Sequence, residues 1–465
     1  MVRIFSHYVS AKLMLLVFLE ALILMLSLRL GYAFHLSGSA AALAGSEAAL
    51  LPPAATFALG MLVVMNSMGL YQLDHWKDEQ SVRVRLVAAV LLGLGLTFLI
   101  MCLVPSLELG PDGWAITMIV ALIGTALVRF AFYKWDKLVA FKPRVLVLGT
   151  GSRVMKLAEL AQRNHNHMMV GYVASPSSTH HYVPLPHVLT MAPGESLLSV
   201  VEKYGIDQIV VAVRDRRGGG FPVQELLECR LKGIKVTELP TYFEREYQQV
   251  LLESLNASWI VLGEGFRQGF LRTSVKRLFD LAASTTLLLL TLPVMLLAAI
   301  CIFLESGQPV LFRQERVGQG GRIFTIYKLR SMKNGAESDG NPRWAVANDD
   351  RTTRVGRIIR NLRIDELPQI INVFKGEMSF VGPRPERPFF VDKLTKQIPY
   401  YALRHSIKPG ITGWAQVRFH YGASLDDAIE KLQYELYYVK NHTLFLDLVV
   451  LFATVEVVLW DRGVR

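Results

Sequence analysis

Long stretches of consecutive apolar residues dominate the first third of the chain. Each is close to the ~20 residues that a helix needs to cross the hydrocarbon layer of a membrane. We predict four transmembrane helices, over 13–34, 54–70, 86–104 and 114–132. A removable signal peptide is the alternative for the first, but Glu20 and Arg29 interrupt its apolar stretch and no small-residue cleavage site follows closely.

Basic residues occur in alternate connecting segments of this predicted bundle. Lys and Arg lie before the first stretch, between the second and third, and after the fourth, whereas 35–53 and 105–113 contain neither. In membrane proteins the cytoplasmic loops carry the excess of Lys and Arg. Both ends of the bundle are therefore expected to face the cytoplasm.

After Pro143 the pattern changes to short β-rich runs that alternate with helical patterns. This alternation predicts a Rossmann-like α/β domain. Its first turn has Gly149 and Gly151, but Val154 stands where a dinucleotide fingerprint has its third glycine, and no acidic ribose ligand follows the second strand. A structural or regulatory domain is therefore favoured over a cofactor site. The predicted strands are 144–149, 169–173, 208–213 and 235–239.

A further apolar run, 281–304, carries Pro293 near its centre. Proline inside a helix removes a backbone hydrogen bond and kinks or breaks the helix. Basic residues both precede and follow the run, so a full crossing would place strongly basic segments on both membrane faces. A re-entrant helix that enters and leaves on the cytoplasmic side removes this conflict. The alternative is an ordinary fifth crossing with a proline kink.

The last apolar run, 444–460, contains Asp447 and Glu456. A charge within a spanning helix is costly. We therefore expect a helix that lies in the plane of the membrane surface rather than another crossing.

Composition supports a membrane protein and narrows its partners. Of the 465 residues, 52% are hydrophobic, and the three cysteines are too widely spaced for a disulfide framework or a zinc site. The formal net charge of +11 indicates anionic partners. Because Lys and Arg flank the apolar segments, membrane lipid and phosphorylated small molecules are favoured over nucleic acid.

Glycine, arginine and lysine are dense between Phe312 and Met332, a segment that includes Arg316 and Lys328. Glycine lets the backbone approach a ligand, and cationic side chains donate hydrogen bonds to phosphate oxygens. We interpret the segment as an anion site near the membrane surface. A basic strip that holds phospholipid headgroups is the alternative.

Two adjacent carboxylates, Asp365 and Glu366, follow an amphipathic helical pattern over 351–360. Pro368 suits the first turn of a new helix, so the carboxylates could serve only as its N-cap and dipole partner. The chemical alternative is that one carboxylate attacks phosphorus while both help to hold a divalent metal. Downstream, Pro383 and Pro385 fix a turn that aims Arg384 at one place, and Arg360 and Arg384 would then stabilise phosphoryl oxygens.

The run of motifs from Lys276 to Gln416 resembles the bacterial sugar transferase family, the monotopic polyprenyl-phosphate phosphoglycosyl transferases. The order and spacing of several motifs match, over roughly the last 190 residues. The helices and the α/β domain in front resemble the large members of that family, found in exopolysaccharide initiation systems. The resemblance implies an enzyme of the bacterial inner membrane whose catalytic domain faces the cytoplasm.

The resemblance also implies the reaction, in which a sugar-1-phosphate passes from a UDP-sugar to undecaprenyl phosphate. Asp365 would form a covalent phosphosugar intermediate as UMP leaves, and Glu366 would assist it and help to position Mg²⁺. Pro293 would mark the break in the re-entrant helix. The phosphate and substrate contacts expected on these grounds are Arg316, Lys328, Arg360, Pro383, Arg384 and Pro385.

One stretch departs from the family pattern: Arg418, Phe419 and His420 stand where Asn-Gly-Arg is common. The nucleotide or sugar contacts of that loop therefore stay open. His405 and His420 are candidate bases, but isolated histidines beside aromatic residues are usually structural. The main rival function is a non-catalytic membrane scaffold or nucleotide sensor. The sequence also leaves open which sugar is transferred, what the α/β domain does, and whether the protein is a homodimer.

The expected membrane protein thus has five parts. They are a four-helix transmembrane bundle over 1–137, the Rossmann-like α/β domain over 142–250, a linker over 251–274, the re-entrant membrane helix over 275–305, and an α-rich catalytic domain with interfacial helices over 306–465.

Overall fold

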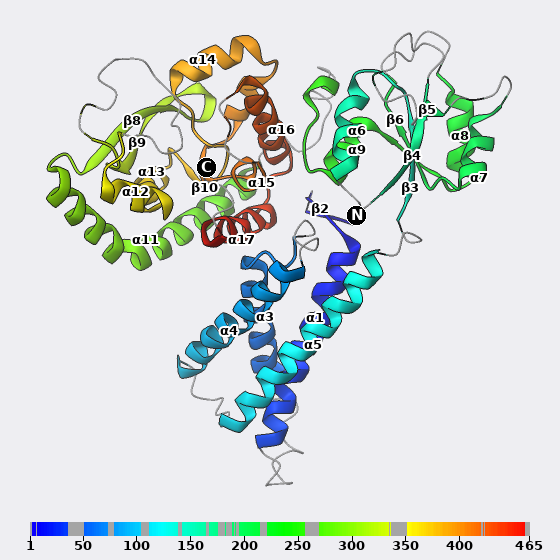
Figure 1. Ribbon diagram of the computed structural model, residues 1–465. Coiled ribbons are helices and arrows are strands. Elements are labelled where there is room, and N and C mark those ends of the chain that lie inside the picture. The colour runs from blue at the N-terminus through cyan, green and yellow to red at the C-terminus, as the bar shows by residue number, and fades with distance from the viewer. Residues whose placement is uncertain are drawn as a thin grey trace. The chain divides into compact units, whose positions relative to one another are not determined.

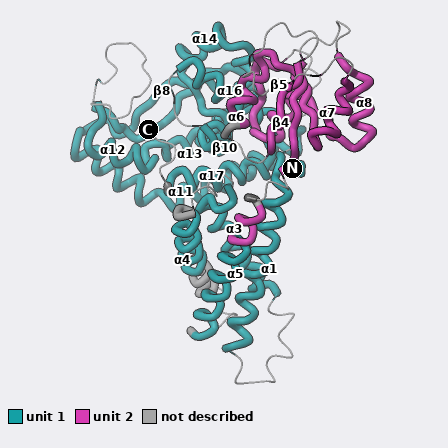
Figure 2. The backbone as a smooth tube through the Cα atoms, turned by 45° about the vertical axis from the view of Figure 1, so that its right-hand side comes forward, with its two compact units in different colours: residues 1–129, 263–465 teal, residues 130–262 magenta. Residues whose placement is uncertain are grey.

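The chain folds into two compact units, Met1–Arg129 with Gly263–Arg465, and Phe130–Leu262 (Figure 2). The computed structural model describes residues 2–5, 7–35, 51–72, 79–103, 111–137, 142–163, 167–174, 182, 188–189, 191, 195–213, 221–255, 269–333, 335, 351–419, 422 and 424–460. Most of the predicted linker and His420 lie outside these residues.

Helices cover most of each of the four predicted transmembrane ranges (Figure 1), although the second ends at Ser67 and the third at Leu103. An antiparallel hairpin, β1 (Val2–Ile4) and β2 (His7–Val9), precedes them. By length and composition, α1 and α5 suffice to cross a membrane, whereas α3 is a shorter apolar helix. The helices are α1 (Ala11–His35), α3 (Leu51–Ser67), α4 (Glu79–Leu103) and α5 (Pro111–Lys137).

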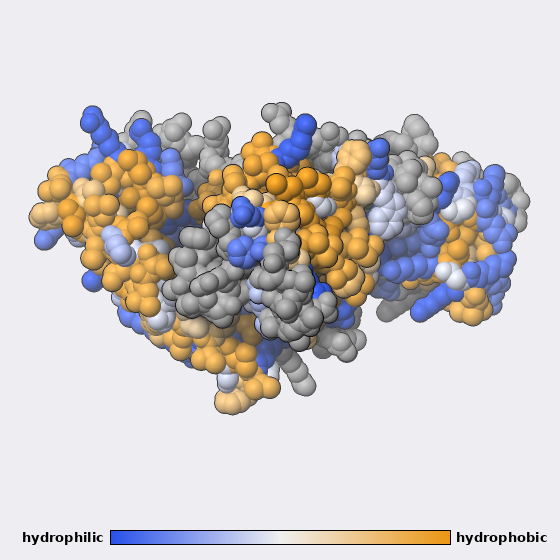
Figure 3. Space-filling model, turned by 90° about the horizontal axis from the view of Figure 1, so that it is seen from below, coloured by the Kyte–Doolittle hydropathy of each residue, from blue (hydrophilic) through white to orange (hydrophobic). Residues whose placement is uncertain are grey.

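The bundle helices expose apolar side chains and bury polar ones. Figure 3 shows hydrophobic residues gathered over the bundle. Inside it, Glu20 of α1 forms an ion pair of 2.7 Å with Arg129 and accepts a hydrogen bond of 2.6 Å from Tyr71. Pairing offsets much of the cost of placing a charge among apolar helices. The exposed side chains of one face of α1 are Met14, Phe18, Leu22, Leu26 and Leu30.

The second unit contains a five-stranded parallel sheet in the order β5-β4-β3-β6-β7. All four predicted strands are present, and the two-residue strand β5 was not predicted. The strands are β3 (Arg144–Leu148), β4 (Met168–Val173), β5 (Val188–Leu189), β6 (Gln208–Val211) and β7 (Lys235–Glu238). The helices are α6 (Arg153–Arg163), α7 (Leu197–Tyr204), α8 (Val223–Leu231), α9 (Leu239–Glu246) and the short η4 (Leu252–Ser254).

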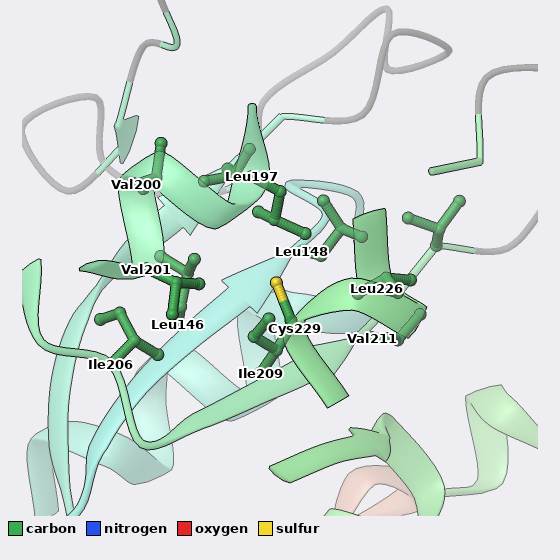
Figure 4. Close-up of a cluster of buried hydrophobic side chains, with 12 residues drawn as sticks. Leu146, Leu148, Leu197, Val200, Val201, Ile206, Ile209, Val211, Leu226 and Cys229 are labelled. Carbon is green, nitrogen blue, oxygen red and sulfur yellow. The ribbon is translucent and has the colours of Figure 1, made fainter. Parts of the chain in front are cut away.

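Alternate residues of β3 serve two cores, because successive strand side chains point to opposite faces of a sheet. Leu146 and Leu148 pack with residues of α7 and α8 (Figure 4). Val145 and Val147 pack with residues of α6 and α9. Helices therefore cover both faces, as a parallel sheet requires.

Gly149 is required by the backbone of this unit whether or not a ligand binds. Its φ is +125°, and an added Cβ would come within 3.2 Å of the backbone of Ala212. The first glycine of the incomplete motif thus has a structural explanation.

The C-terminal part of the first unit begins with α11 (Phe270–Ser306), a helix long and apolar enough to cross a membrane, with Pro293 inside it. Figure 1 shows α11 as a bent helix. Its two ends are hydrogen-bonded to the elements that follow: Arg277 donates to the carbonyl of Val373, and Arg330 donates to the carbonyl of Ser306.

Two small sheets and several helices follow α11. The antiparallel pair is β8 (Leu311–Val317) with β9 (Ile323–Leu329), and the parallel pair is β10 (Ser379–Val381) with β11 (Gly410–Thr412). The strands β8 and β9 lie almost entirely in the segment 312–332, where the density of charged residues predicted an anion site and no strand was predicted. The helical elements are η5 (Gln319–Gly321), α12 (Arg354–Asn361), η6 (Ile364–Gln369), α13 (Ile370–Lys375), α14 (Pro388–Gln397), η7 (Tyr401–Ser406), α15 (Trp414–Arg418), α16 (Leu425–Asn441) and α17 (Leu444–Trp460).

Candidate active site

Asp365 and Glu366 lie side by side in the short helix η6, between α12 and α13. The backbone of Arg363 is left-handed, with φ 55° and ψ 21°, so the chain turns sharply into η6. Both carboxylates are buried, each with 9% of its surface exposed. No side chain caps η6 or α13, so neither carboxylate acts as an N-cap there.

Glu366 is held by two cationic side chains. Lys328 Nζ from β9 donates to its Oε1 at 2.8 Å, and Arg384 Nη2 donates to the same oxygen at 2.7 Å. Burial acts to raise the pKa of Glu366, but Arg384 and Lys328 hold that pKa well below its usual value. Glu366 is therefore ionised at neutral pH.

Asp365 is in a different state. Among the residues that the structure describes, nothing donates a hydrogen bond to its carboxylate. Burial and the adjacent Glu366 raise the pKa of Asp365 to about 6, against the opposing effect of Lys328, Arg360 and Arg384. Because this value lies below 7, the ionised form prevails at neutral pH. A buried, ionised carboxylate whose oxygens are not engaged is suited to attack an electrophile.

The turn that carries Arg384 is fixed by the strand pair β10–β11. Gly382 N donates to the carbonyl of Thr412, and Gly410 N donates to the carbonyl of Pro383, each at 2.9 Å. An added Cβ at Gly382 would lie 2.8 Å from the backbone nitrogen of Gly410. The glycine therefore permits the close approach that holds the turn in place.

Arg404 supports the same turn and was not identified from the sequence. Its Nη2 donates to the carbonyl of Arg384 at 2.6 Å and to Glu435 at 2.7 Å, and its Nη1 donates to the hydroxyl of Tyr401 at 2.7 Å. Arg404 is buried, with 3% of its surface exposed. Its charge partner Glu435 lies 31 positions later in the chain, a separation that no periodic pattern links to a site.

Arg360 and Arg316 donate hydrogen bonds to groups other than the carboxylates. Arg360 donates to the hydroxyl of Thr352 at 3.3 Å and contributes to the charge around Asp365. Arg316 donates to the carbonyl of Pro385 at 3.0 Å, so it contacts the turn rather than the carboxylates. The predicted residues thus form one cluster, in which Lys328 and Arg384 touch Glu366 directly.

A family comparison matches this part of the chain. The model of the bacterial sugar transferase family matches residues 271–461. The uncharacterized sugar transferase EpsL of Bacillus subtilis strain 168 is 42% identical over 191 residues, which are 41% of this chain and 90% of that protein. The chain belongs to the bacterial sugar transferase family.

Two further members of the family match more of the chain. The UDP-N-acetylgalactosamine-undecaprenyl-phosphate N-acetylgalactosaminephosphotransferase of Aeromonas hydrophila is 40% identical over 259 residues, 56% of this chain and 60% of that protein. The UDP-glucose:undecaprenyl-phosphate glucose-1-phosphate transferase of Xanthomonas campestris pv. campestris is 32% identical over 330 residues, 69% of this chain and 67% of that protein. The chain thus spans less than two thirds of the Aeromonas relative.

The departure from the family pattern after Val417 has a packing role. The guanidinium of Arg418 lies 4.5 Å from the ring centre of Trp414. Such stacking is favourable because the ring face carries negative charge density. Arg418 therefore contributes to the packing of α15.

His405 lies in the part of the chain that the family model matches, and it is packed against an aromatic ring. Its ring lies 6.3 Å from that of Tyr401. Burial, and secondly Arg404, lower the pKa of His405 to about 4. It is therefore neutral at neutral pH and packed beside an aromatic ring, as the structural interpretation expects.

The two carboxylates fit a Mg²⁺ site that a substrate completes. Within the described part of the chain, no group of three or more His, Cys, Asp or Glu residues could hold a metal ion. Oε1 of Glu366 accepts hydrogen bonds from both Lys328 and Arg384, and Oε2 lies 3.9 Å from Nη1 of Arg363. Proteins commonly hold Mg²⁺ by one or two carboxylates together with substrate phosphates. Asp365 and Glu366 match that donor set.

Proposed function

We propose that this chain transfers a sugar-1-phosphate from a UDP-sugar to undecaprenyl phosphate, the first membrane step of exopolysaccharide or related glycoconjugate synthesis. Its family and the names of its relatives support this reaction class. The observation that carries the proposal is the contrast between two adjacent carboxylates. Lys328 and Arg384 hold Glu366 at 2.8 and 2.7 Å, while the oxygens of Asp365 are left for chemistry.

Asp365 is the nucleophile of the first step. One of its carboxylate oxygens attacks the phosphorus that bears the sugar, and a bond forms between that oxygen and phosphorus. The bond from this phosphorus to the oxygen of UMP breaks, and UMP leaves with the electron pair. Arg384 and Arg360 stabilise the negative charge on the transferring group, because fixed cations act most strongly in a site from which water is excluded.

Undecaprenyl phosphate is the nucleophile of the second step. Its phosphate oxygen attacks the same phosphorus, the bond to Asp365 breaks, and the sugar leaves on undecaprenyl diphosphate. Asp365 is then an ionised carboxylate again, so the cycle is balanced. Asp365 and Glu366 would hold Mg²⁺, which would supply neutralisation of the phosphate charge when bound. Glu366, kept ionised by its two cations, orients Arg384 throughout.

The membrane helix α11 is proposed to enter and leave on the cytoplasmic side. Near its start, Arg277 donates to the carbonyl of Phe374 at 2.8 Å, and at its end Arg330 donates to the carbonyl of Ser306 at 2.9 Å. Both ends are thus tied to the same C-terminal part of the chain. Pro293, between them, is the residue type that bends helices.

The four helices α1, α3, α4 and α5 are proposed to form a transmembrane bundle with both ends in the cytoplasm. The basic segments lie on that side, and the catalytic part then faces the cytoplasm of the bacterial inner membrane. This placement suits the acceptor, whose phosphate stays at headgroup level while its prenyl chain stays in lipid.

The test is UMP release by the purified protein with a panel of UDP-sugars, Mg²⁺ and undecaprenyl phosphate. We expect release with at least one donor, and a loss on the order of 10³-fold or more in Asp365→Asn, because the attacking oxygen is removed. Asp426→Asn, which changes an exposed carboxylate on α16, is the matched control and should keep full activity.

The covalent step has its own readout. Without acceptor, label from the sugar phosphate should stay on the wild-type chain and not on Asp365→Asn. An equally active Asp365→Asn variant, or no UMP from any donor, would refute the mechanism and favour the scaffold or nucleotide-sensor alternative.

A further inference from the structure

Helix α17 connects the N-terminal bundle with the strands that carry the Arg384 turn. Along its length it contacts α3 of the bundle and both β10 and β11. Figure 1 shows it between the bundle and the rest of the C-terminal part. Helix α17 thus contacts both the N-terminal helices and the strands that hold the Arg384 turn.

At the bundle end, a carboxylate of α17 is enclosed by a turn. Glu456 has 2% of its surface exposed, and its Oε1 lies 2.9 Å from Nη1 of Arg85 on α4. Gln72 donates to its other oxygen. Arg85 also donates to the carbonyl of Met68 at 2.8 Å, and an added Cβ at Gly69 would collide with Glu456. The turn 68–72 is therefore shaped around this one side chain.

At the active-site end, α17 holds β11. Oγ1 of Thr454 lies 2.7 Å from Oγ1 of Thr412. Thr454 donates its own hydrogen to the carbonyl of Val450, so Thr412 is the donor between the two hydroxyls. The carbonyl of Thr412 accepts from Gly382 N at 2.9 Å, and the turn 383–385 follows directly.

A second contact ties α17 to β10. Asp447 accepts a hydrogen bond of 2.5 Å from the hydroxyl of Tyr438 and pairs with Lys276 at 2.9 Å. The same hydroxyl lies 3.0 Å from the carbonyl of Val381. Both strands that fix the turn are thus held by residues of α17 or their direct partners.

We propose that Glu456 is a positioning residue for the reaction, and that its ion pair with Arg85 makes the N-terminal bundle a determinant of active-site geometry. A buried carboxylate that loses its cation is strongly destabilised. Without Arg85, α17 must move to bring Glu456 to water, and Thr454 moves with it. Since a displacement of about 1 Å at a reacting group costs up to ~100-fold in rate, a small shift suffices. The kinetic part of this inference rests on the proposed function.

The kinetic test compares Arg85→Leu, Glu456→Leu and the charge-swapped double variant R85E/E456R, all in full-length protein in lipid nanodiscs. Each single variant should lower kcat for UMP release about tenfold with KM for the UDP-sugar within about twofold, and the swap should recover at least about threefold. Lys393→Leu removes a charge from an exposed position of α14 and should leave kcat unchanged. Thr454→Val, which preserves shape, should lower kcat about threefold.

The structural test is amide hydrogen exchange over Ser379–Val381 and Gly410–Thr412. Exchange should rise about tenfold in both single variants, return toward wild type in the swap, and stay unchanged in Lys393→Leu. The proposal is overturned by unchanged exchange in the single variants. A loss of activity that tracks only the loss of folded protein, with full kcat in Thr454→Val, also overturns it. A wild type without UMP release would refute the proposed function, while exchange would still decide whether the ion pair controls the strands.

Discussion

Lys328 and Arg384 donate to the same oxygen of Glu366, and this arrangement determines the state of its neighbour. Two adjacent buried carboxylates cannot both ionise easily, because like charges at short range repel. The two cations keep Glu366 ionised, so burial and the charge of Glu366 raise the pKa of Asp365 instead. Within the part of the chain that the structure describes, Glu366 is therefore fixed by hydrogen bonds, whereas the oxygens of the adjacent Asp365 are not.

At the residue scale we predict that Arg384→Gln lowers kcat/KM about 10²-fold or more, because a fixed donor to the transferring phosphoryl group is lost. Arg384→Lys should recover only part of this, since an ammonium lacks the planar, forked donors of a guanidinium. Steady-state UMP release measures both. Lys396→Gln, an exposed position on α14, is the control, and equal effects of the two glutamine substitutions would refute the assignment.

The chemistry of single residues was the part most accessible from sequence. Asp365, Glu366, Lys328 and Arg384 stand in a motif order that specifies a family, and the structure brings them together. Arg404 was missed because its partner is distant in sequence and a buried arginine looks like any other basic residue.

At the element scale, short strands do much of the positioning. The parallel pair β10–β11 has three residues in each strand, yet its hydrogen bonds fix the turn that carries Arg384. Parallel pairing brings residues from distant parts of the chain together. The helix α17 was predicted with its observed bounds, because a long apolar run is a strong signal. The strands β8 and β9 were not, since charged residues obscure their alternation.

We predict that Gly382→Ala destabilises the protein by about 1–3 kcal/mol and lowers kcat, because the added methyl group must push the strands β10 and β11 apart. Thermal unfolding in detergent and UMP release give the two readouts. Gly95→Ala is the matched control, because a Cβ there meets nothing within 4 Å and alanine favours a helix. Equal stability of the two variants would show that the close approach is relaxed in solution.

At the scale of the whole molecule, the first unit is held together by contacts between its N-terminal and C-terminal parts. The ring of His7 on β2 lies 5.7 Å from that of Trp414, and its Nδ1 lies 3.0 Å from the hydroxyl of Tyr437. Such contacts join residues hundreds of positions apart, so no local pattern predicts them. For this reason the sequence indicated only that Asp447 and Glu456 would be unfavourable in a membrane-spanning helix. In the structure, Asp447 forms an ion pair with Lys276 and Glu456 forms one with Arg85.

We predict that stability falls as the pH falls from about 6.5 to about 4. Burial, and secondly nearby arginine side chains, lower the pKa of His7 and of His442 to about 4, whereas an unfolded histidine titrates near 6.5. Between these values the unfolded chain binds more protons than the folded chain, so the free energy of unfolding falls as the pH falls. Each histidine lowers it by up to ~1.4 kcal/mol for every pH unit between its folded and unfolded pKa values. Thermal midpoints across this range should drop, and less so in His442→Asn. A flat profile would contradict the assignment.

The enclosure of Glu456 by the turn 68–72 also bears on how such a protein changes during evolution. Arg85 and Glu456 stand 371 positions apart, at opposite ends of the sequence. A chimera that borrows its first helices from a relative would bring a foreign turn against this side chain. Recombination between members should therefore succeed best when α17 is exchanged together with α1, α3, α4 and α5, so that the two partners of this ion pair are inherited as one module.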